Sequence, residues 1–196
     1  MRTRDEHKEQ TIRKKAMEMI VREGIDRFSI QKLAREAKVS PATMYIYFKN
    51  KDDLILQLYA EASNRMFESA LRGFDSSMPF SKGLRIQWKN RLEFSLGNHA
   101  EALFLEHMKS CPVHDKAIKL IDPRFREIMA AFIGNAVKNK ELVKVPLEVY
   151  WSVAFAPLYN LIRMHRSGVS KGGEKFVLDE KTVNKTLKLV LKALKP

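Results

Sequence analysis

The stretch from Ser29 to Lys51, SIQKLAREAKVSPATMYIYFKNK, constrains the fold of this chain more than any other. Ser29 is a typical helix N-cap. After it, apolar residues recur at the spacing of one helix face, at Ile30, Leu33, Ala34 and Ala37. Ser40 and Pro41 then start a second helix, because proline at the first helical position loses an N–H that would have no partner anyway. Two short helices joined by a tight turn form a helix-turn-helix, so the stretch predicts a DNA-binding regulator.

A third helix follows the pair. Met44, Tyr45 and Phe48 give the second helix an inner face, and that helix ends near Lys49. Asn50, with Asp53 three residues later, is a capping sequence for a further helix that begins at Lys51. Upstream, residues 5–22 predict a helix that Gly24 terminates.

The rest of the chain predicts helices only. They cover residues 51–72, 81–96, 100–110, 123–139, 147–167 and 180–194, separated by glycine and proline. Pro157 should kink the helix 147–167, since it removes one backbone hydrogen bond. No stretch shows sustained period-two alternation, so we expect an all-α fold without a sheet.

The charge of the chain favours a polyanionic partner. Its net charge is +13, and residues 1–51 hold 13 of the 36 Lys and Arg but only 7 of the 23 Asp and Glu. The single cysteine, Cys111, fits a reducing compartment. The N-terminus lacks the apolar segment of a signal peptide, and the longest uncharged run, Val149–Ile162, is too short to span a bilayer. We therefore expect a soluble cytoplasmic protein.

Residues 8–59 resemble the DNA-binding domain of the TetR family of bacterial transcriptional regulators. The resemblance rests on these features: the pair Leu33-Ala34, the turn Val39-Ser40, the run Thr-x-Tyr-x-Tyr-Phe from Thr43 to Phe48, and Lys51 followed by Leu54. Two positions depart from the family pattern. Lys38 stands at the turn where the family most often has glycine, and Ile46 is apolar where polar or basic residues are common. A left-handed Lys38 would cost roughly 1 kcal/mol.

The resemblance implies the organisation and function of the chain. It implies a helix-turn-helix DNA-binding domain of residues 1–50 and a helical ligand-binding and dimerisation domain of residues 51–196. Such a protein binds a palindromic operator as a homodimer, and it is usually a repressor that a small ligand, here expected to be apolar, releases from DNA. In the bacterial cytoplasm it would associate with the nucleoid when bound.

The expected DNA contacts come from the helix-turn-helix and from the start of the next helix. They are Ser29, Gln31, Ser40, Pro41, Ala42, Thr43, Tyr45, Ile46, Tyr47 and Lys51. By family position Tyr47 contacts phosphate, whereas Tyr45 packs inward with a partial DNA contact. The second helix holds no Arg, Asn or Gln that could bind a base with two hydrogen bonds. We therefore expect DNA shape and phosphate contacts to carry more of the affinity than direct base readout.

The helical body supplies the other two expected sites. The candidate ligand-pocket residues are Trp88, Phe94, Leu103, Phe104, Met108, Phe132, Phe155 and Tyr159. The candidate dimer interface, a four-helix bundle formed by the last two long helices and their mates, consists of Tyr150, Trp151, Leu158, Val183, Leu187, Val190 and Leu191.

Other classes of function fit the residues less well. No nucleophile-and-base motif, glycine-rich phosphate loop or helical carboxylate pair is evident, so we expect neither an enzyme nor a cofactor. His107, Cys111 and His114 are plausible metal ligands, but Pro112 interrupts them and no second cluster exists, so we expect no metal site. A lipid or small-molecule carrier would explain the apolar helices but not the stretch Ser40–Lys51. An architectural DNA-binding protein without a ligand remains a further alternative.

Overall fold

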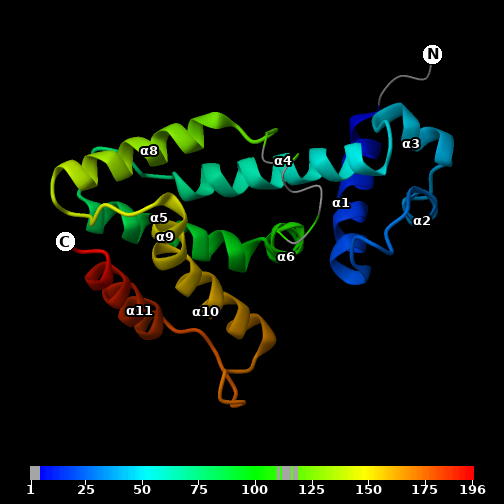
Figure 1. The fold of residues 1–196 in the computed structure, drawn as a ribbon. Coiled ribbons are helices and arrows are strands. Elements are labelled where there is room, and N and C mark those ends of the chain that lie inside the picture. Colours follow the sequence, from blue (N-terminus) through cyan, green and yellow to red (C-terminus); the bar gives the residue numbers. More distant parts are fainter. Residues whose placement is uncertain (1–4, 110, 112–115, 117–118) are drawn as a thin grey trace. The chain divides into compact units, whose positions relative to one another are not determined.

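The computed structural model describes residues 5–109, 111, 116 and 119–196. Its regular elements within these residues are all helices, and the only strand-like feature there is an isolated bridge between Val169 and Lys175 (Figure 1). The all-α fold class that the sequence predicts is therefore confirmed. The chain forms two compact units, residues 1–65 with 98–122 and residues 66–97 with 123–196.

The first unit contains three short N-terminal helices whose ends match the predicted signals. Helix α1 spans Glu6–Glu23 and ends at Gly24, which has a φ of 83°. Helix α2 spans Ile30–Glu36, and the Ser29 hydroxyl accepts a hydrogen bond from the Lys32 N–H. Helix α3 spans Pro41–Tyr47, with Ser40 as its N-cap. Each boundary is set by its own few residues, which is why the sequence predicts it well.

The turn between α2 and α3 is left-handed at Lys38, where φ is 55°. Glycine adopts this conformation without strain, whereas a lysine there brings its β-carbon close to the next carbonyl oxygen. The Val39 N–H closes the turn by donating to the Ala34 carbonyl at 2.9 Å. Lys38 therefore has the left-handed conformation in which a lysine is strained.

Helix α6 and the N-terminal part of α4 complete the first unit. Helix α4 spans Lys51–Ala70, and its start is capped by Asn50, whose side-chain oxygen accepts the Asp53 N–H at 2.9 Å. Helix α6 spans His99–Met108 and packs on α1. Residue 110, the last of the predicted helix, lies outside the described residues. The core of this unit joins α1 to the helix-turn-helix and to α6, through buried side chains that include Ile12, Leu33, Met44, Phe48 and Phe104.

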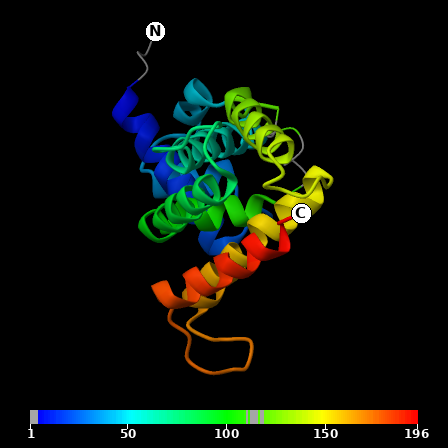
Figure 2. The ribbon, with the colours of Figure 1, turned by 90° about the vertical axis from the view of Figure 1, so that its left-hand side faces the viewer.

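The second unit contains the remaining long helices. They are α5 (Phe80–Gly97), α8 (Pro123–Lys138), α9 (Leu147–Ala154), α10 (Ala156–Ser167) and α11 (Glu180–Ala193). Helices α10 and α11 lie side by side, as Figures 1 and 2 both show. Aromatic side chains dominate the core. Phe132 packs on Phe74 and Phe80, with ring centroids 4.9 and 5.7 Å apart.

The predicted helix 147–167 is broken rather than merely bent. Phe155, with φ −124° and ψ −28°, separates α9 from α10 two residues before Pro157. Proline cannot donate a backbone hydrogen bond, so carbonyls of the preceding turn lose their usual partners. The Trp88 indole N–H takes one of these carbonyls, that of Ala154, at 2.8 Å. A side chain of α5 thereby stabilises the break.

Helix α4 contributes residues to both compact units, up to Arg65 to the first and from Met66 to the second. These units are defined by contacts, and they divide the chain differently from the expected domains 1–50 and 51–196. The functional boundary between residues 50 and 51 stays a prediction. Within the described residues, no helix is both long and apolar enough to cross a membrane.

Candidate nucleic-acid interface

Helix α3 is held at its start by two hydroxyl groups. The Ser40 Oγ accepts a hydrogen bond from the Thr43 N–H at 3.1 Å, as an N-cap does. The same Oγ lies 2.8 Å from the Thr43 Oγ1, so the two hydroxyls are also hydrogen-bonded to each other. Pro41 occupies the first helical position, as the sequence predicts. The first turn of α3 is therefore ordered before any ligand arrives.

One face of α3 is open to solvent and the other is buried. Pro41 and Ala42 are exposed, and Tyr45 and Ile46 keep 57% and 43% of their surface exposed. Met44 is fully buried in the core of the first unit. Apolar side chains that lie together on a protein surface can mark an interaction site. In a groove of B-DNA, such side chains can contact thymine methyl groups.

The two tyrosines of α3, Tyr45 and Tyr47, are exchanged in burial relative to the expectation: Tyr47 is buried and Tyr45 is exposed. Tyr47 is only 8% exposed, and its hydroxyl donates to the Asp5 carbonyl at 3.2 Å and accepts the Asp5 N–H at 3.1 Å. Tyr45, expected to pack inward, points out instead. The sequence cannot distinguish them, because the choice depends on the N-terminus of α1, 42 residues earlier. Tyr47 therefore joins α3 to α1, and Tyr45 is the more accessible tyrosine.

A shallow hollow of about 240 Å³ lies beside α3. It is lined by Asp5, Lys8, Lys38, Val39, Ser40, Thr43, Ile46 and Tyr47. Asp5 caps α1, and hydrogen bonds from Lys8, the backbone one foremost, lower the pKa of its carboxyl below the ordinary value. Exposed Lys8 and Lys38 bring positive charge to the rim of this hollow.

The remaining predicted contacts lie at the ends of α2 and α4. Ser29 is half-buried as the cap of α2, and Gln31 is exposed one residue after the helix starts. Lys51 stands at the first position of α4, where the unpaired N–H groups of the helix favour an anion. Its amine donates to the Ile25 carbonyl at 2.9 Å and lies over the Phe28 ring. A phosphate contact would have to share the amine with this loop.

The expected ligand-pocket residues belong to two different units. Phe104 and Met108, with the half-buried Leu103 before them, belong to α6 in the first unit, whereas the other five belong to the second unit. Phe132 and Phe155 are completely buried in the core of the second unit. Phe104 and Met108 are buried in the core that α6 shares with α1. The ligand pocket itself stays a prediction.

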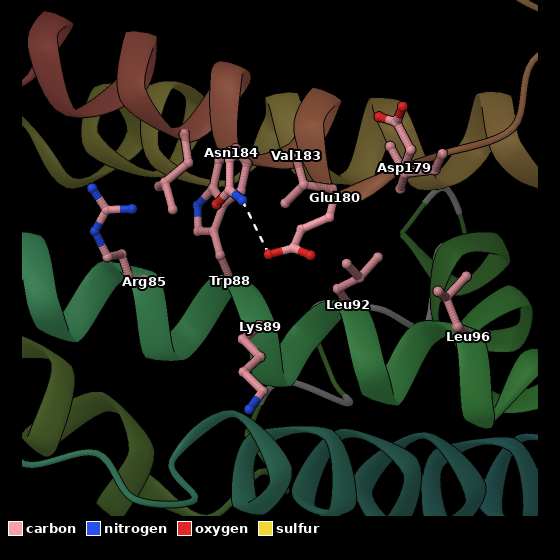
Figure 3. Close-up of a pocket in the computed structure, with 11 residues that line it drawn as sticks. Arg85, Trp88, Lys89, Leu92, Leu96, Asp179, Glu180, Val183 and Asn184 are labelled. Carbon is pink, nitrogen blue, oxygen red and sulfur yellow. Dashed lines mark hydrogen bonds between the residues drawn. The ribbon is translucent and has the colours of Figure 1, made fainter.

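Trp88 is the one predicted pocket residue that lines a groove of about 430 Å³ between α5 and α11. In Figure 3, Leu92 and Leu96 of α5 point toward α11, and Lys89 points away from the groove. Glu180 and Asn184 are hydrogen-bonded to each other on the α11 side. The floor of the groove is thus apolar, with polar groups at its edge.

Four of the expected interface residues cannot present a surface. Tyr150, Leu158, Leu187 and Val190 are at most 5% exposed, because they fill the core between the helices of their own chain. Leu187 and Val190 of α11 therefore pack within their own chain, and these four residues are removed from the predicted dimer interface. The three other members, Trp151, Val183 and Leu191, are half-buried.

The candidate metal ligands are not brought together in the described part of the chain. Among those residues, no group of three His, Cys, Asp or Glu side chains is arranged to hold a metal ion. His114 lies outside the described residues, whereas His107 and Cys111 line a separate hollow with Ile20 and Gly24.

Comparisons with known proteins point to one family. Residues 12–58 match the model of the bacterial regulatory proteins of the tetR family. Over 95 residues, 48% of the chain, the sequence is 39% identical to an uncharacterised helix-turn-helix transcriptional regulator of Haemophilus influenzae, of which the match covers 50%. The chain spans half or less of the length of the curated relatives it matches.

Solved structures extend the likeness to the whole fold. A TetR-family regulator from Haemophilus influenzae superimposes with a TM-score of 0.77 at 23% identity, covering 97% of this chain and 98% of its own. A Bacillus subtilis transcriptional regulator in complex with stearoyl-CoA has a TM-score of 0.72 at 16% identity, covering 95% of this chain and 99% of its own. The helix-turn-helix region therefore matches the model of the tetR family of bacterial regulatory proteins, and the fold of the chain is similar to that of solved TetR-family regulators.

Proposed function

We propose that this protein is a transcriptional regulator that binds an inverted-repeat operator as a homodimer and that a small ligand releases it. The observation that carries the proposal is the exposed face of α3, with Tyr45 and Ile46 presented beside the ordered pair Ser40 and Thr43. Inserting the second helix of a helix-turn-helix into the major groove is the usual use of such a face.

The homodimer follows from the small size of the reading surface. One seven-residue helix contacts only a few base pairs, and a two-fold dimer doubles the contacts and matches a palindrome. Trp151, Val183 and Leu191 are the members of the predicted interface that keep some exposed surface, and they support a dimer through the last helices. Repression is the family habit, and we adopt it as part of the proposal.

A ligand-responsive body is supported by the second unit, whose interior is rich in aromatic side chains. The Bacillus subtilis regulator with a similar fold was solved with stearoyl-CoA, which is a precedent for an apolar effector in such a body. The carrier alternative leaves the exposed face of α3 without a purpose. The architectural alternative is separated from the regulator only by a ligand that changes DNA binding.

Selection of fragments from random genomic DNA tests the main proposal. We expect wild type to recover a discrete inverted repeat, and recovery of nothing at moderate salt would contradict the proposal. Tyr45→Ala with Ile46→Ala should abolish the selection without lowering stability, because both side chains are exposed. Glu68→Ala, also exposed on α4, is the matched control and should leave the selection unchanged.

Operator variants test how the sequence is read. Helix α3 carries no Arg, Asn or Gln, so we expect small and similar losses of affinity for each base change, with a strong dependence on salt. A loss above about 3 kcal/mol at a single base pair would show that direct readout dominates instead. Lys51→Gln should weaken binding to all operators alike and reduce the salt dependence.

A further inference from the structure

Arg91 of α5 is a buried cation that has no acidic partner among the residues the structure describes. The residue is 1% exposed. Its Nη1 donates to the Tyr159 hydroxyl at 2.9 Å and lies 3.4 Å from the Met66 sulfur. Its Nη2 reaches only the Gln87 side-chain oxygen, at 3.4 Å. All three partners are uncharged, and the structure pairs Arg91 with no carboxylate among the residues it describes.

Aromatic rings surround the same guanidinium. Its central carbon lies 4.4 Å from the centroid of Phe155, 5.2 Å from that of Trp151 and 5.7 Å from that of Phe125. Ring faces attract a cation, but they do not neutralise it. A charge taken out of water without a counter-charge is unfavourable unless something else compensates for the lost hydration. An anion paired with Arg91 would therefore stabilise the folded state.

One edge of the guanidinium is open for that anion. Nε is buried and has no hydrogen-bond partner, and Nη2 on the same edge has only the long contact to Gln87. The Nε–Nη2 edge carries two parallel N–H groups, which match the two oxygens of a carboxylate. Nη1 already contacts Tyr159 and Met66, so the N–H groups available to an anion lie on the Nε–Nη2 edge alone.

Tyr150 supplies a second buried group without a partner. Its hydroxyl forms no hydrogen bond, and the residue is 1% exposed. Burial raises the pKa of Tyr150 far above the ordinary value, while Arg91 opposes the shift. The hydroxyl therefore stays neutral at physiological pH, so it can donate to an anion but cannot serve as the counter-charge of Arg91.

We propose that Arg91 anchors a binding site for an organic monocarboxylate with an apolar or aromatic body. The carboxylate binds the Nε–Nη2 edge in place of Gln87, and the body of the acid packs among Phe125, Trp151 and Phe155. One negative charge balances the one positive charge. The inference rests on the proposed function in one respect, since this acid would be the effector.

The acid would reach Arg91 past those surrounding side chains that are only half-buried. Met66, Trp151 and Tyr159 keep some exposed surface, whereas Gln87 and Phe155 have none. Side-chain rotation of Trp151 and Tyr159 would open a path from solvent to Arg91. The acid must therefore displace side chains as it enters.

Matched acids and neutral analogues test the charge requirement on the full chain. The probes are octanoate against octanamide, and phenylacetate against phenylacetamide, at equal millimolar concentrations. We expect the acids to raise the thermal unfolding temperature and to bind with one-to-one stoichiometry by calorimetry, and the amides to do neither. Equal effects of acid and amide, or no effect of either acid, would overturn the inference.

Substitutions then locate the site. Arg91→Met keeps much of the side chain's length without its charge, and it should weaken binding of the acids at least roughly tenfold. Tyr159→Phe keeps the charge, folds with one hydroxyl fewer, and should weaken the acids less. Arg72→Met removes an exposed arginine from the same unit and should change nothing. Acid binding that persists in a folded Arg91→Met protein would place the site elsewhere and refute the assignment.

The two proposals fail separately. Operator selection uses the protein without added acid, whereas the thermal measurement uses no DNA. A protein that selects an operator but ignores the acids would refute the inference alone. A protein that binds the acids through Arg91 but selects no DNA would refute the proposed regulator and leave the carboxylate site standing.

Discussion

Ser40 and Thr43 join their side-chain hydroxyls across 2.8 Å, so the residue that caps α3 also holds a hydroxyl of the exposed helix. The Ser40 Oγ accepts the Thr43 N–H as well, at 3.1 Å. We therefore expect Ser40 to contribute mainly to the stability of α3 and Thr43 mainly to DNA recognition. Ser40 satisfies the backbone, whereas Thr43 offers a side chain whose hydroxyl is already oriented.

This pair gives the first prediction. Ser40→Ala removes the cap and should lower the free energy of unfolding by about 1 kcal/mol. Thr43→Val keeps the backbone bond and the shape but loses the hydroxyl, so it should weaken operator binding with little change in stability. Urea denaturation and operator titration separate the effects. Equal losses of stability in both variants would contradict this division.

Lys38 gives the second prediction, because its φ of 55° strains any residue with a β-carbon. Lys38→Gly should raise the free energy of unfolding by about 1 kcal/mol. Lys38→Ala keeps the β-carbon and should bring no such gain. Lys140, with φ 58° in the second unit, offers a replicate, and Lys140→Gly should stabilise the protein as well. If Ala and Gly at position 38 prove equal by urea denaturation, backbone strain is not the cause.

Gly83 gives the third prediction, which concerns the aromatic core. A β-carbon at Gly83 would lie 2.6 Å from the Phe132 ring and 2.9 Å from the Phe74 ring. Gly83→Ala should therefore cost about 1 to 3 kcal/mol of stability, since both rings must move. Gly134 in α8 has open space at its β-position, so Gly134→Ala should stabilise the helix by up to about 1 kcal/mol. Thermal unfolding of both variants checks the opposite signs.

Asp179 gives the fourth prediction, a dependence of stability on pH. The Asp179 carboxylate caps α11 by accepting a hydrogen bond from the Thr182 N–H. Hydrogen bonds from Thr182, the side-chain one foremost, lower the pKa of this carboxyl below its ordinary value of 3.8. The charged form therefore stabilises the folded state above about pH 3.8, and this contribution is lost as the pH falls through the lower folded-state pKa.

Asp179→Asn isolates this effect, since asparagine also caps helices but does not titrate. The variant should be less stable than wild type at neutral pH, because the charge near the helix N-terminus is lost. The difference in free energy of unfolding should shrink as the solution is acidified below pH 3.8. A difference that stays constant from neutral to acidic pH would mean that the charge contributes nothing.

The sequence predicts what depends on neighbouring residues. Ser29, Ser40 and Asn50 each cap the helix expected of them, because an N-cap bonds to backbone only a few residues away. The break near Pro157 is foreseeable for the same reason, since proline disturbs its own turn. The expected strain at Lys38 also follows from a local turn.

What the sequence does not predict depends on distant contacts. Tyr45 and Tyr47 are two residues apart and equally suited to either side of α3, and Asp5 decides between them. Helix α6 joins the first unit through α1, about 90 residues earlier, so Phe104 and Met108 become core residues of that unit. Arg91 looks like an ordinary surface arginine of an amphipathic helix until its aromatic shell is assembled.

The hydrogen bond from Trp88 to the Ala154 carbonyl bears on the tryptophan fluorescence of the protein. The chain has two tryptophans, and they report on different surroundings. Trp88 is 1% exposed and hydrogen-bonded at the break between α9 and α10, whereas Trp151 is half-buried against Arg91. Replacing Trp88 by phenylalanine would leave Trp151 as the sole indole fluorophore, next to a positive charge. Its emission would then follow events at Arg91 without any attached dye, and the protein carries that label in its own sequence.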